Sequence, residues 1–382
     1  MKVGIMTYWW SSDNYGQLLQ CFALQQYLRN VGFDVYLIRY YPRSDVARLS
    51  MWKKILKIFD PVMLKRYFVY RKRKVFGENN NRDNLRGFAS FRDKHIRQSE
   101  KIYYSYKELI ENPPIADVYI VGSDQVWNTF GTSIHRGINR VNAFLLNFGD
   151  SSIKRISYAA SFGKTQNELG SDFVEVFTPL LQKFNYVSVR EISGLEICKL
   201  CGIDDAEWVP DPTVLLDAEA YRFLYDAEQM VKKTNKPYCF LYLVGNQFTF
   251  PVQAIYNWAK KKKIEIVYIA GNWRQDKHEK TYATIPEWIY LLEHAEYVLT
   301  NSFHATIFSL LFRKNFCIIP SVGEGVGMNS RFDSLFQLFG IENRFVNTDF
   351  SIFDESIDWQ VVSNTFQQLR NTCKLSTIIM DA

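Results

Sequence analysis

Apolar runs of strand length alternate with longer segments of helical spacing along most of the chain. Strands are expected at residues 2–8, 33–40, 116–121, 154–161 and 186–190, and again at 238–244, 264–270, 297–300 and 316–320. Helices are expected at residues 15–31, 84–96, 105–112, 172–185, 191–201, 250–262, 285–295, 302–313 and 330–340. Strands that alternate with helices in this way run parallel through right-handed crossovers, so the pattern predicts an α/β protein.

At 382 residues the chain is too long for one ordinary core and is expected to form two domains. We assign residues 1–206 to a first α/β domain, with a basic helical insert near residues 50–100, and residues 207–345 to a second. Residues 346–382 are expected to form a helical tail that packs back on the first domain. Pro210 and Pro212 suit a linker or the first strand of the second unit. The predicted architecture is two Rossmann-like domains that face each other across a cleft at the carboxyl ends of their strands.

The composition supports two folded cores, with 47% apolar residues and 29 Phe, 23 Tyr and 9 Trp, and it excludes a disordered chain. The six cysteines show no extracellular disulfide framework, so a cytoplasmic protein is expected. Cys198 and Cys201 form a C-x-x-C pair near the end of a predicted helix, where core packing is favoured over a redox or metal pair. No stretch of the sequence reads as a signal peptide or a membrane span.

A basic stretch is the main departure from an even charge distribution. Residues 51–101 contain 15 Lys and Arg against 5 Asp and Glu, within a chain of net charge +6. Three interpretations of its core, residues 51–75, are open: a solvated helical lid, a segment lying on the inner face of an anionic membrane, and a nucleic-acid patch. We favour the lid, then the peripheral membrane contact, because interleaved aromatic and basic residues suit a lipid interface. No nucleic-acid partner is expected, since no recognised reading module accompanies the charge.

The segment Thr300-Asn301-Ser302-Phe303-His304 holds one of only five histidines. It joins a predicted buried strand to a helix, with Ser302 as the N-cap and His304 on the first turn. Free N–H groups and the positive end of the helix dipole bind anions at such a position. A bound phosphate or carboxylate would stabilise the protonated imidazole, which makes His304 a candidate general acid. The alternative is a histidine that only packs between the domains.

Two arginines are candidate anion-binding residues. Arg190 ends a predicted strand and Arg331 opens a predicted helix, where a guanidinium can grip a carboxylate or phosphate by two parallel bonds. The alternative is a structural ion pair, of Arg190 with Glu191 and of Arg331 with Asp333.

Three further polar or aromatic residues follow predicted strands. Asp124 is placed to orient or deprotonate a sugar hydroxyl, and Trp127 to stack on the apolar face of a sugar ring. The alternative for this pair is a loop-capping aspartate and a core tryptophan. Asn14, before the first helix, suits either an N-cap or contact with an acceptor.

Taken together, the motifs resemble the polysaccharide pyruvyl transferase family. The resemblance is carried by Asp13-Asn14-Tyr15-Gly16 with Leu19-Gln20 and Ala23-Leu24, Gly122-Ser123-Asp124-Gln125-Val126-Trp127-Asn128, Tyr158-Ala159-Ala160-Ser161-Phe162-Gly163, Ser188-Val189-Arg190-Glu191 with Ser193, Asp211-Pro212-Thr213, and Thr300-Asn301-Ser302-Phe303-His304. The resemblance implies a two-domain fold of the glycosyltransferase B type. It also implies a reaction that uses phosphoenolpyruvate to place a pyruvate ketal on a sugar of a cell-surface polysaccharide or its lipid-linked precursor.

By this resemblance, His304 matches the family histidine at the start of a helix in the second domain. Many members carry an arginine two residues before that histidine, where this chain has Ser302, so Arg190, Arg331 or Lys314 has to supply the charge. The implied scheme protonates the methylene carbon of phosphoenolpyruvate, lets a sugar hydroxyl attack C2, releases phosphate and closes the ketal with a second hydroxyl. It needs neither a metal nor a cofactor.

Two other functions fit the same architecture. One is a glycosyltransferase that uses a sugar nucleotide, since a fold does not by itself determine function. The other is a carbohydrate-binding protein without catalytic activity.

Overall fold

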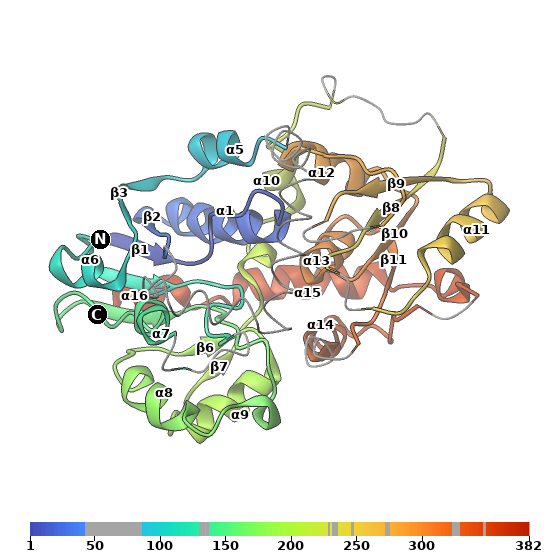
Figure 1. The fold of residues 1–382 in the computed structure, drawn as a ribbon. Coiled ribbons are helices and arrows are strands. Elements are labelled where there is room, and N and C mark those ends of the chain that lie inside the picture. Colours follow the sequence, from blue (N-terminus) through green and yellow to red (C-terminus); the bar gives the residue numbers. More distant parts are fainter. Residues whose placement is uncertain are drawn as a thin grey trace, which may run out of the picture.

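The computed structural model describes residues 1–42, 86–129, 134, 137–227, 230, 236–245, 248–271, 276–322, 329–346 and 349–381. The basic stretch 51–75 and the glycines at 323, 325 and 327 lie outside these residues. Within them, the chain forms two parallel sheets surrounded by helices (Figure 1).

The first sheet has five parallel strands in the order β3-β2-β1-β4-β5. The strands are β1 (Lys2–Met6), β2 (Asp34–Tyr40), β3 (Gln98–Tyr103), β4 (Val118–Val121) and β5 (Lys154–Ser157). A small two-stranded sheet, β6 (Ser188–Val189) with β7 (Glu207–Trp208), lies beside β5. β7 pairs with β6 in parallel, so the chain stays beside the first sheet as far as Trp208.

Helices flank this first sheet. They are α1 (Tyr15–Asn30), α5 (Phe88–His95), α6 (Tyr106–Glu111), α7 (Ile138–Phe144), α8 (Phe173–Leu181) and α9 (Ile192–Leu200). Buried strand residues explain the sheet's stability, because β4 is buried along its whole length and β1 along all but its first residue.

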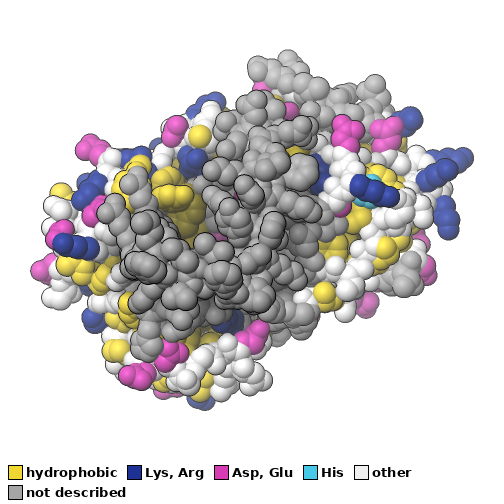
Figure 2. Space-filling view, viewed as in Figure 1, with side chains coloured by type: hydrophobic (Ala, Val, Ile, Leu, Met, Phe, Trp, Pro, Cys, Tyr) yellow, Lys and Arg dark blue, Asp and Glu magenta, His cyan; other side chains and the backbone are white. Residues whose placement is uncertain are grey.

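The second sheet has four parallel strands in the order β11-β10-β8-β9. The strands are β8 (Tyr238–Tyr242), β9 (Glu265–Ile269), β10 (Tyr297–Thr300) and β11 (Asn315–Ile318). The accompanying helices are α10 (Ala218–Arg222), α11 (Val252–Lys262), α12 (Ile285–Glu293), α13 (Phe303–Leu311) and α14 (Ser330–Phe339). Exposed lysines at the end of α11, Lys260 to Lys263, gather at one edge of the molecule (Figure 2, right), where they complement the negative end of the helix dipole.

The two sheets share packed surfaces instead of meeting only through a linker. Tyr15 of α1 stacks on Trp288 of α12 at a centroid distance of 5.4 Å, and its hydroxyl donates to the carbonyl of Ala283 at 2.6 Å. At the C-terminus, α15 (Trp359–Asn371) lies beside α13 and α14, and α16 (Leu375–Met380) follows it. Leu375 and Ile379 of α16 are buried against the first sheet.

The α/β class and the expected order of strands and helices are confirmed. The pattern did not predict β3, whose polar residues are exposed or half-exposed, nor α7. Cys198 and Cys201 are free and buried, which confirms their packing role. In the described residues, no helix is long and apolar enough to cross a bilayer.

Candidate functional site

A pocket of about 490 Å³ lies where the carboxyl ends of the two sheets face each other. Residues that follow β1 and β4 line one side, and residues that follow β8, β10 and β11 line the other. The lining residues are Tyr8, Trp10, Asn14, Gln17, Pro42, Asp124, Gln125, Arg140, Val244, Asn301, Ser302, Phe303, His304, Ser321 and Arg331. The volume falls within the range of about 300–1,000 Å³ that small-molecule sites occupy.

His304 stands on the first turn of α13, with 8% of its surface exposed, and lines this pocket. Ser302 is the N-cap of the helix, as predicted, and its hydroxyl accepts from the backbone N–H of Ala305 at 3.4 Å. The Nε2 atom of His304 is buried and lies 3.4 Å from a carboxylate oxygen of Asp211, which is an ion-pair distance without hydrogen-bond alignment. Nε2 therefore faces Asp211, while Nδ1 lies on the side of the ring that packs against Gly16.

Asp211 is the buried partner that holds this ring. Its carboxylate accepts from the Ser123 hydroxyl at 2.6 Å, from Arg190 Nη1 at 2.9 Å, and from the Thr213 hydroxyl at 2.7 Å. Burial alone would raise the pKa of Asp211, but the positive charges of His304 and Arg190 and these hydrogen bonds hold it well below its usual range. Asp211 is therefore a permanent anion behind the imidazole.

Gly16 lies against the other side of the ring. A Cβ placed on Gly16 would lie 2.9 Å from the Cβ of His304 and closer still to Cγ and Nδ1. The N-terminus of α1 therefore approaches the imidazole to a distance that only glycine allows. Any side chain at position 16 would overlap the imidazole of His304.

Arg190 does not line the pocket, and its guanidinium interacts with buried side chains next to it. It is 3% exposed, donates to Asp211 and Ser123, and has Glu191 at 4.0 Å. Although burial lowers the pKa of Arg190, the adjacent Asp211 and Glu191 carboxylates raise it above its ordinary value. The structure thus favours the ion-pair interpretation for this arginine, with Asp211 as the principal partner.

Arg331 instead lines the pocket, at the start of α14. Its guanidinium lies 5.7 Å from the centroid of the Phe303 ring, while that of Arg190 lies 4.7 Å from the same ring. Burial and the positive charge of Arg190 lower the pKa of Arg331 to about 10. Arg331 therefore stays protonated at neutral pH, and an anion in the pocket would be attracted to its charge.

Asp124 and Asn14 line the opposite side, on the loops after β4 and β1. Asp124 adopts a left-handed backbone conformation with φ of 81°, and its carboxylate accepts from Gln125 N at 2.9 Å and from Gln17 Nε2 at 3.5 Å. Asn14 is the N-cap of α1 and accepts from Gln17 N at 3.2 Å. Both residues therefore combine a structural role with a place on the pocket wall.

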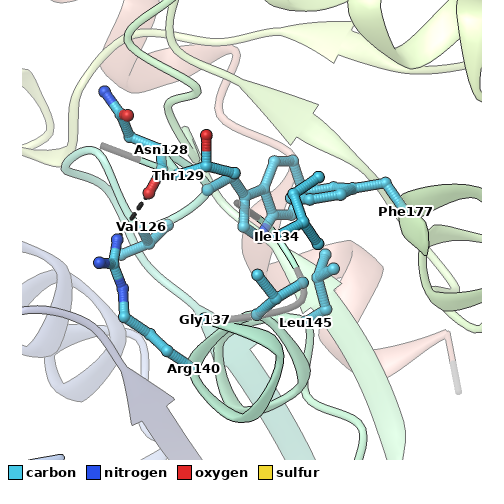
Figure 3. Close-up of a pocket in the computed structure, with 10 residues that line it drawn as sticks. Val126, Asn128, Thr129, Ile134, Gly137, Arg140, Leu145 and Phe177 are labelled. Carbon is cyan, nitrogen blue, oxygen red and sulfur yellow. Dashed lines mark hydrogen bonds between the residues drawn. The ribbon is translucent and has the colours of Figure 1, made fainter. Parts of the chain in front are cut away.

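Trp127 and Lys314 do not face this pocket. Trp127 is 2% exposed, donates to the Phe144 carbonyl at 3.1 Å and packs on Phe162, so it is the core tryptophan of the alternative interpretation. It is part of the wall of a separate small cavity. Phe177 and Leu145, which line the same cavity, are labelled in Figure 3. Lys314 follows the C-terminal end of α13, whereas the pocket lies at the N-terminal end. Lys314 therefore cannot replace the missing arginine at position 302.

Among the residues of the site that were assigned no role from the sequence, Trp10 and Arg140 line the pocket, and Gly16 and Asp211 contact His304. Arg140 lies on the unpredicted helix α7 and donates to the Tyr8 hydroxyl at 2.7 Å. It also donates to the Asn128 carbonyl at 2.6 Å, as Figure 3 shows. Gly16 and Asp211 belong to motifs that were recognised, but their roles depend on contacts between segments far apart in the chain.

A family model described as polysaccharide pyruvyl transferase matches residues 14–321. No curated protein matches the chain. Similar solved structures include the UDP-GlcNAc 2-epimerase of Neisseria meningitidis bound to UDP-GlcNAc, with a TM-score of 0.51, 10% identity and coverage of 100% of both chains.

Two others are the UDP-GlcNAc 2-epimerase of Methanocaldococcus jannaschii in complex with UDP-GlcNAc and UDP, and the glycosyltransferase SnogD of Streptomyces nogalater. The first has a TM-score of 0.46, 12% identity and coverage of 98% of this chain and 94% of the epimerase. The second has a TM-score of 0.41, 12% identity and coverage of 99% of both chains. The Neisseria meningitidis likeness concerns the fold alone, and agrees with two Rossmann-like domains facing across a cleft.

Proposed function

The chain belongs to the polysaccharide pyruvyl transferase family, and we propose that it moves the enolpyruvyl group of phosphoenolpyruvate onto a saccharide and closes a pyruvate ketal. The acceptor is a sugar of a cell-surface polysaccharide or of its lipid-linked precursor. The observation that carries the proposal is the position of His304: an imidazole backed by the buried Asp211 carboxylate, on the wall of a pocket that also presents Arg331.

The pocket suits a small molecule with several negative charges. Helices α1 and α13 both begin at the pocket, and their N-caps, Asn14 and Ser302, are part of its wall. The positive ends of two helix dipoles therefore point toward the pocket. Arg331 and Arg140 add two guanidinium groups from opposite sides. Phosphoenolpyruvate carries a phosphate and a carboxylate, which these groups would bind.

His304 supplies the proton in this scheme. The Asp211 carboxylate lies 3.4 Å from Nε2, and the imidazole, which lines the pocket, would donate its proton to the methylene carbon of the donor. A positioned acid of this kind contributes about 10²–10⁴-fold to the rate of such a step.

Asp124 is assigned to the acceptor. Its carboxylate lines the pocket on the side of the first sheet, across from His304, and would orient or deprotonate the attacking hydroxyl. The left-handed backbone at Asp124 fixes the direction of the side chain.

The bonds balance without an additional reactant. The proton from His304 forms the C–H bond that turns the methylene into a methyl group, and the first hydroxyl oxygen forms a bond to C2. The C2–O bond to phosphate then breaks, and the second hydroxyl oxygen closes the ketal. Of the two protons released by the hydroxyls, one returns to His304 and one leaves on inorganic phosphate.

Two measurements test the proposal. Phosphoenolpyruvate should raise the melting temperature of the protein, whereas a panel of sugar nucleotides should not. Inorganic phosphate should then be released from phosphoenolpyruvate only when a suitable saccharide is added. Stabilisation by a sugar nucleotide, with no response to phosphoenolpyruvate, would instead favour the glycosyltransferase alternative.

A further inference from the structure

Trp10 differs from the other tryptophans near the pocket. It lies in the loop after β1, lines the pocket and is half-buried, whereas Trp9 and Trp127 are 8% and 2% exposed. The indole N–H of Trp9 donates to the Tyr40 carbonyl at 3.0 Å, and that of Trp127 donates to the Phe144 carbonyl. Among the described residues, nothing accepts a hydrogen bond from the indole N–H of Trp10. Its N–H is thus available to a ligand.

The Trp10 ring is held firmly by its neighbours. Tyr8, Trp9 and Tyr41 lie at centroid distances of 5.2, 6.4 and 5.4 Å, with interplanar angles of 75°, 88° and 80°. All three are edge contacts, and in the part of the chain that the structure describes no aromatic ring stacks parallel to the indole. A ring fixed in this way loses little freedom when a flat apolar surface stacks on it.

The loop of Trp10 is connected to the carboxylate that we assign to the acceptor. The backbone N–H of Ser11 donates to Gln17 Oε1 at 3.0 Å, and Gln17 Nε2 donates to Asp124 at 3.5 Å. A ligand stacked on Trp10 therefore has hydrogen-bonding groups at its rim, on the same side of the pocket.

The two sheets contribute different residues to the pocket wall. Trp10 and Asp124 come from the first sheet, while Ser302, His304 and Arg331 come from the second. A pyranose has an apolar face of C–H groups and a rim of hydroxyls, which matches an indole face with a free N–H beside a carboxylate.

We infer that Trp10 is the stacking surface for the pyranose ring of the acceptor, which brings its hydroxyls to Asp124 and leaves the second-sheet wall to the anionic donor. The inference rests on the proposed function in requiring a saccharide in this pocket. It also corrects the expectation from the sequence, which gave this role to Trp127.

The test uses the full chain and three neutral probes: methyl β-galactoside, methyl β-glucoside and methyl β-N-acetylmannosaminide. Binding of each is followed by tryptophan fluorescence and by saturation-transfer NMR. At least one probe should change the native fluorescence, and Trp10→Phe should abolish that change while binding persists by NMR. Trp10→Ala should weaken binding by about tenfold, which corresponds to about 1.4 kcal/mol.

Matched controls separate a local effect from a folding defect. Trp359→Phe, on α15, should keep the fluorescence response, and Phe223→Ala, at a side chain that is 87% exposed, should keep the affinity. The rise in melting temperature with phosphoenolpyruvate should be unchanged in Trp10→Ala, which shows that the second-sheet wall is intact.

Three results would overturn the inference: no probe binds the native protein, Trp10→Ala binds as well as the native chain, or the fluorescence change survives in Trp10→Phe. Failure of the proposed function has a different signature. In that case sugars bind through Trp10, but phosphoenolpyruvate neither stabilises the protein nor yields phosphate.

Discussion

Replacement of Gly16 by alanine is the most specific perturbation that the site allows. Gly16 is the second residue of α1, where helix propensity alone predicts that alanine would stabilise the protein by up to about 1 kcal/mol. The contact with His304 predicts the opposite. The new methyl carbon would lie 2.9 Å from the His304 Cβ and closer to the ring, whereas ordinary contacts begin at 3.4 Å.

The cost of Gly16→Ala depends on whether His304 or α1 can move to relieve the overlap. The His304 ring cannot move away from Gly16, because Asp211 lies on its far side. Gly16 cannot move easily either, because Tyr15, the preceding residue of α1, is fully buried against α12. Overpacking in such a place costs about 1–3 kcal/mol, which offsets or exceeds the gain from helix propensity. A displacement of the ring by about 1 Å would lower turnover by about 100-fold.

The assay compares urea unfolding and phosphate release from phosphoenolpyruvate for Gly16→Ala and for Gly170→Ala. Gly170 is an exposed matched control, since a methyl group there would approach only the Asp172 carboxylate, at 3.0 Å. We expect a folded Gly16→Ala protein with greatly reduced turnover and a Gly170→Ala protein that behaves like the native chain. A more stable Gly16→Ala protein with native turnover would refute the reasoning.

Three other outcomes are expected. Asp211→Asn should lower the free energy of unfolding by about 3–5 kcal/mol, because it removes the nearest counter-charge of the buried Arg190 and leaves only the more distant Glu191, as urea unfolding at neutral pH would reveal. The pKa of Asp211 is lowered in the folded state, so its contribution is complete above the ordinary aspartate pKa of about 3.9 and is lost as the pH falls below it. The difference between native and Asp211→Asn unfolding energies should therefore shrink as the pH falls below about 4; a difference that grows as the pH falls below about 4 would contradict this assignment. Arg331→Lys should raise the KM for phosphoenolpyruvate by about tenfold, because lysine cannot form two parallel bonds to one anion, while Arg313→Lys on the exposed surface should leave it unchanged.

The sequence predicted the architecture well because the buried strands and amphipathic helices leave a strong local pattern. The strand before Asp124 and the Ser302 N-cap of α13 lie where the pattern places them. The same local logic predicted that Asp124, Asn14 and His304 follow strands at their carboxyl ends, and all three line one pocket.

The local sequence pattern did not predict which residues these side chains contact. Nothing near Asp211 in the sequence indicates that its carboxylate meets His304, because the two are brought together only by the packing of α13 against the segment after β7. Trp127 and Trp10 look alike as loop tryptophans, and only their burial separates a core residue from a pocket residue. Arg190 likewise ends a strand as predicted, but its charge is taken up by Asp211 behind the wall.

Transfer in D₂O tests most directly whether His304 delivers the proton. The native protein, phosphoenolpyruvate and a saccharide acceptor are incubated in D₂O, and the product is followed by proton NMR. The account predicts a pyruvate ketal whose methyl group carries one deuterium, and no ketal from His304→Gln even though phosphoenolpyruvate still raises its melting temperature. Ketal formation by His304→Gln at the native rate would contradict it.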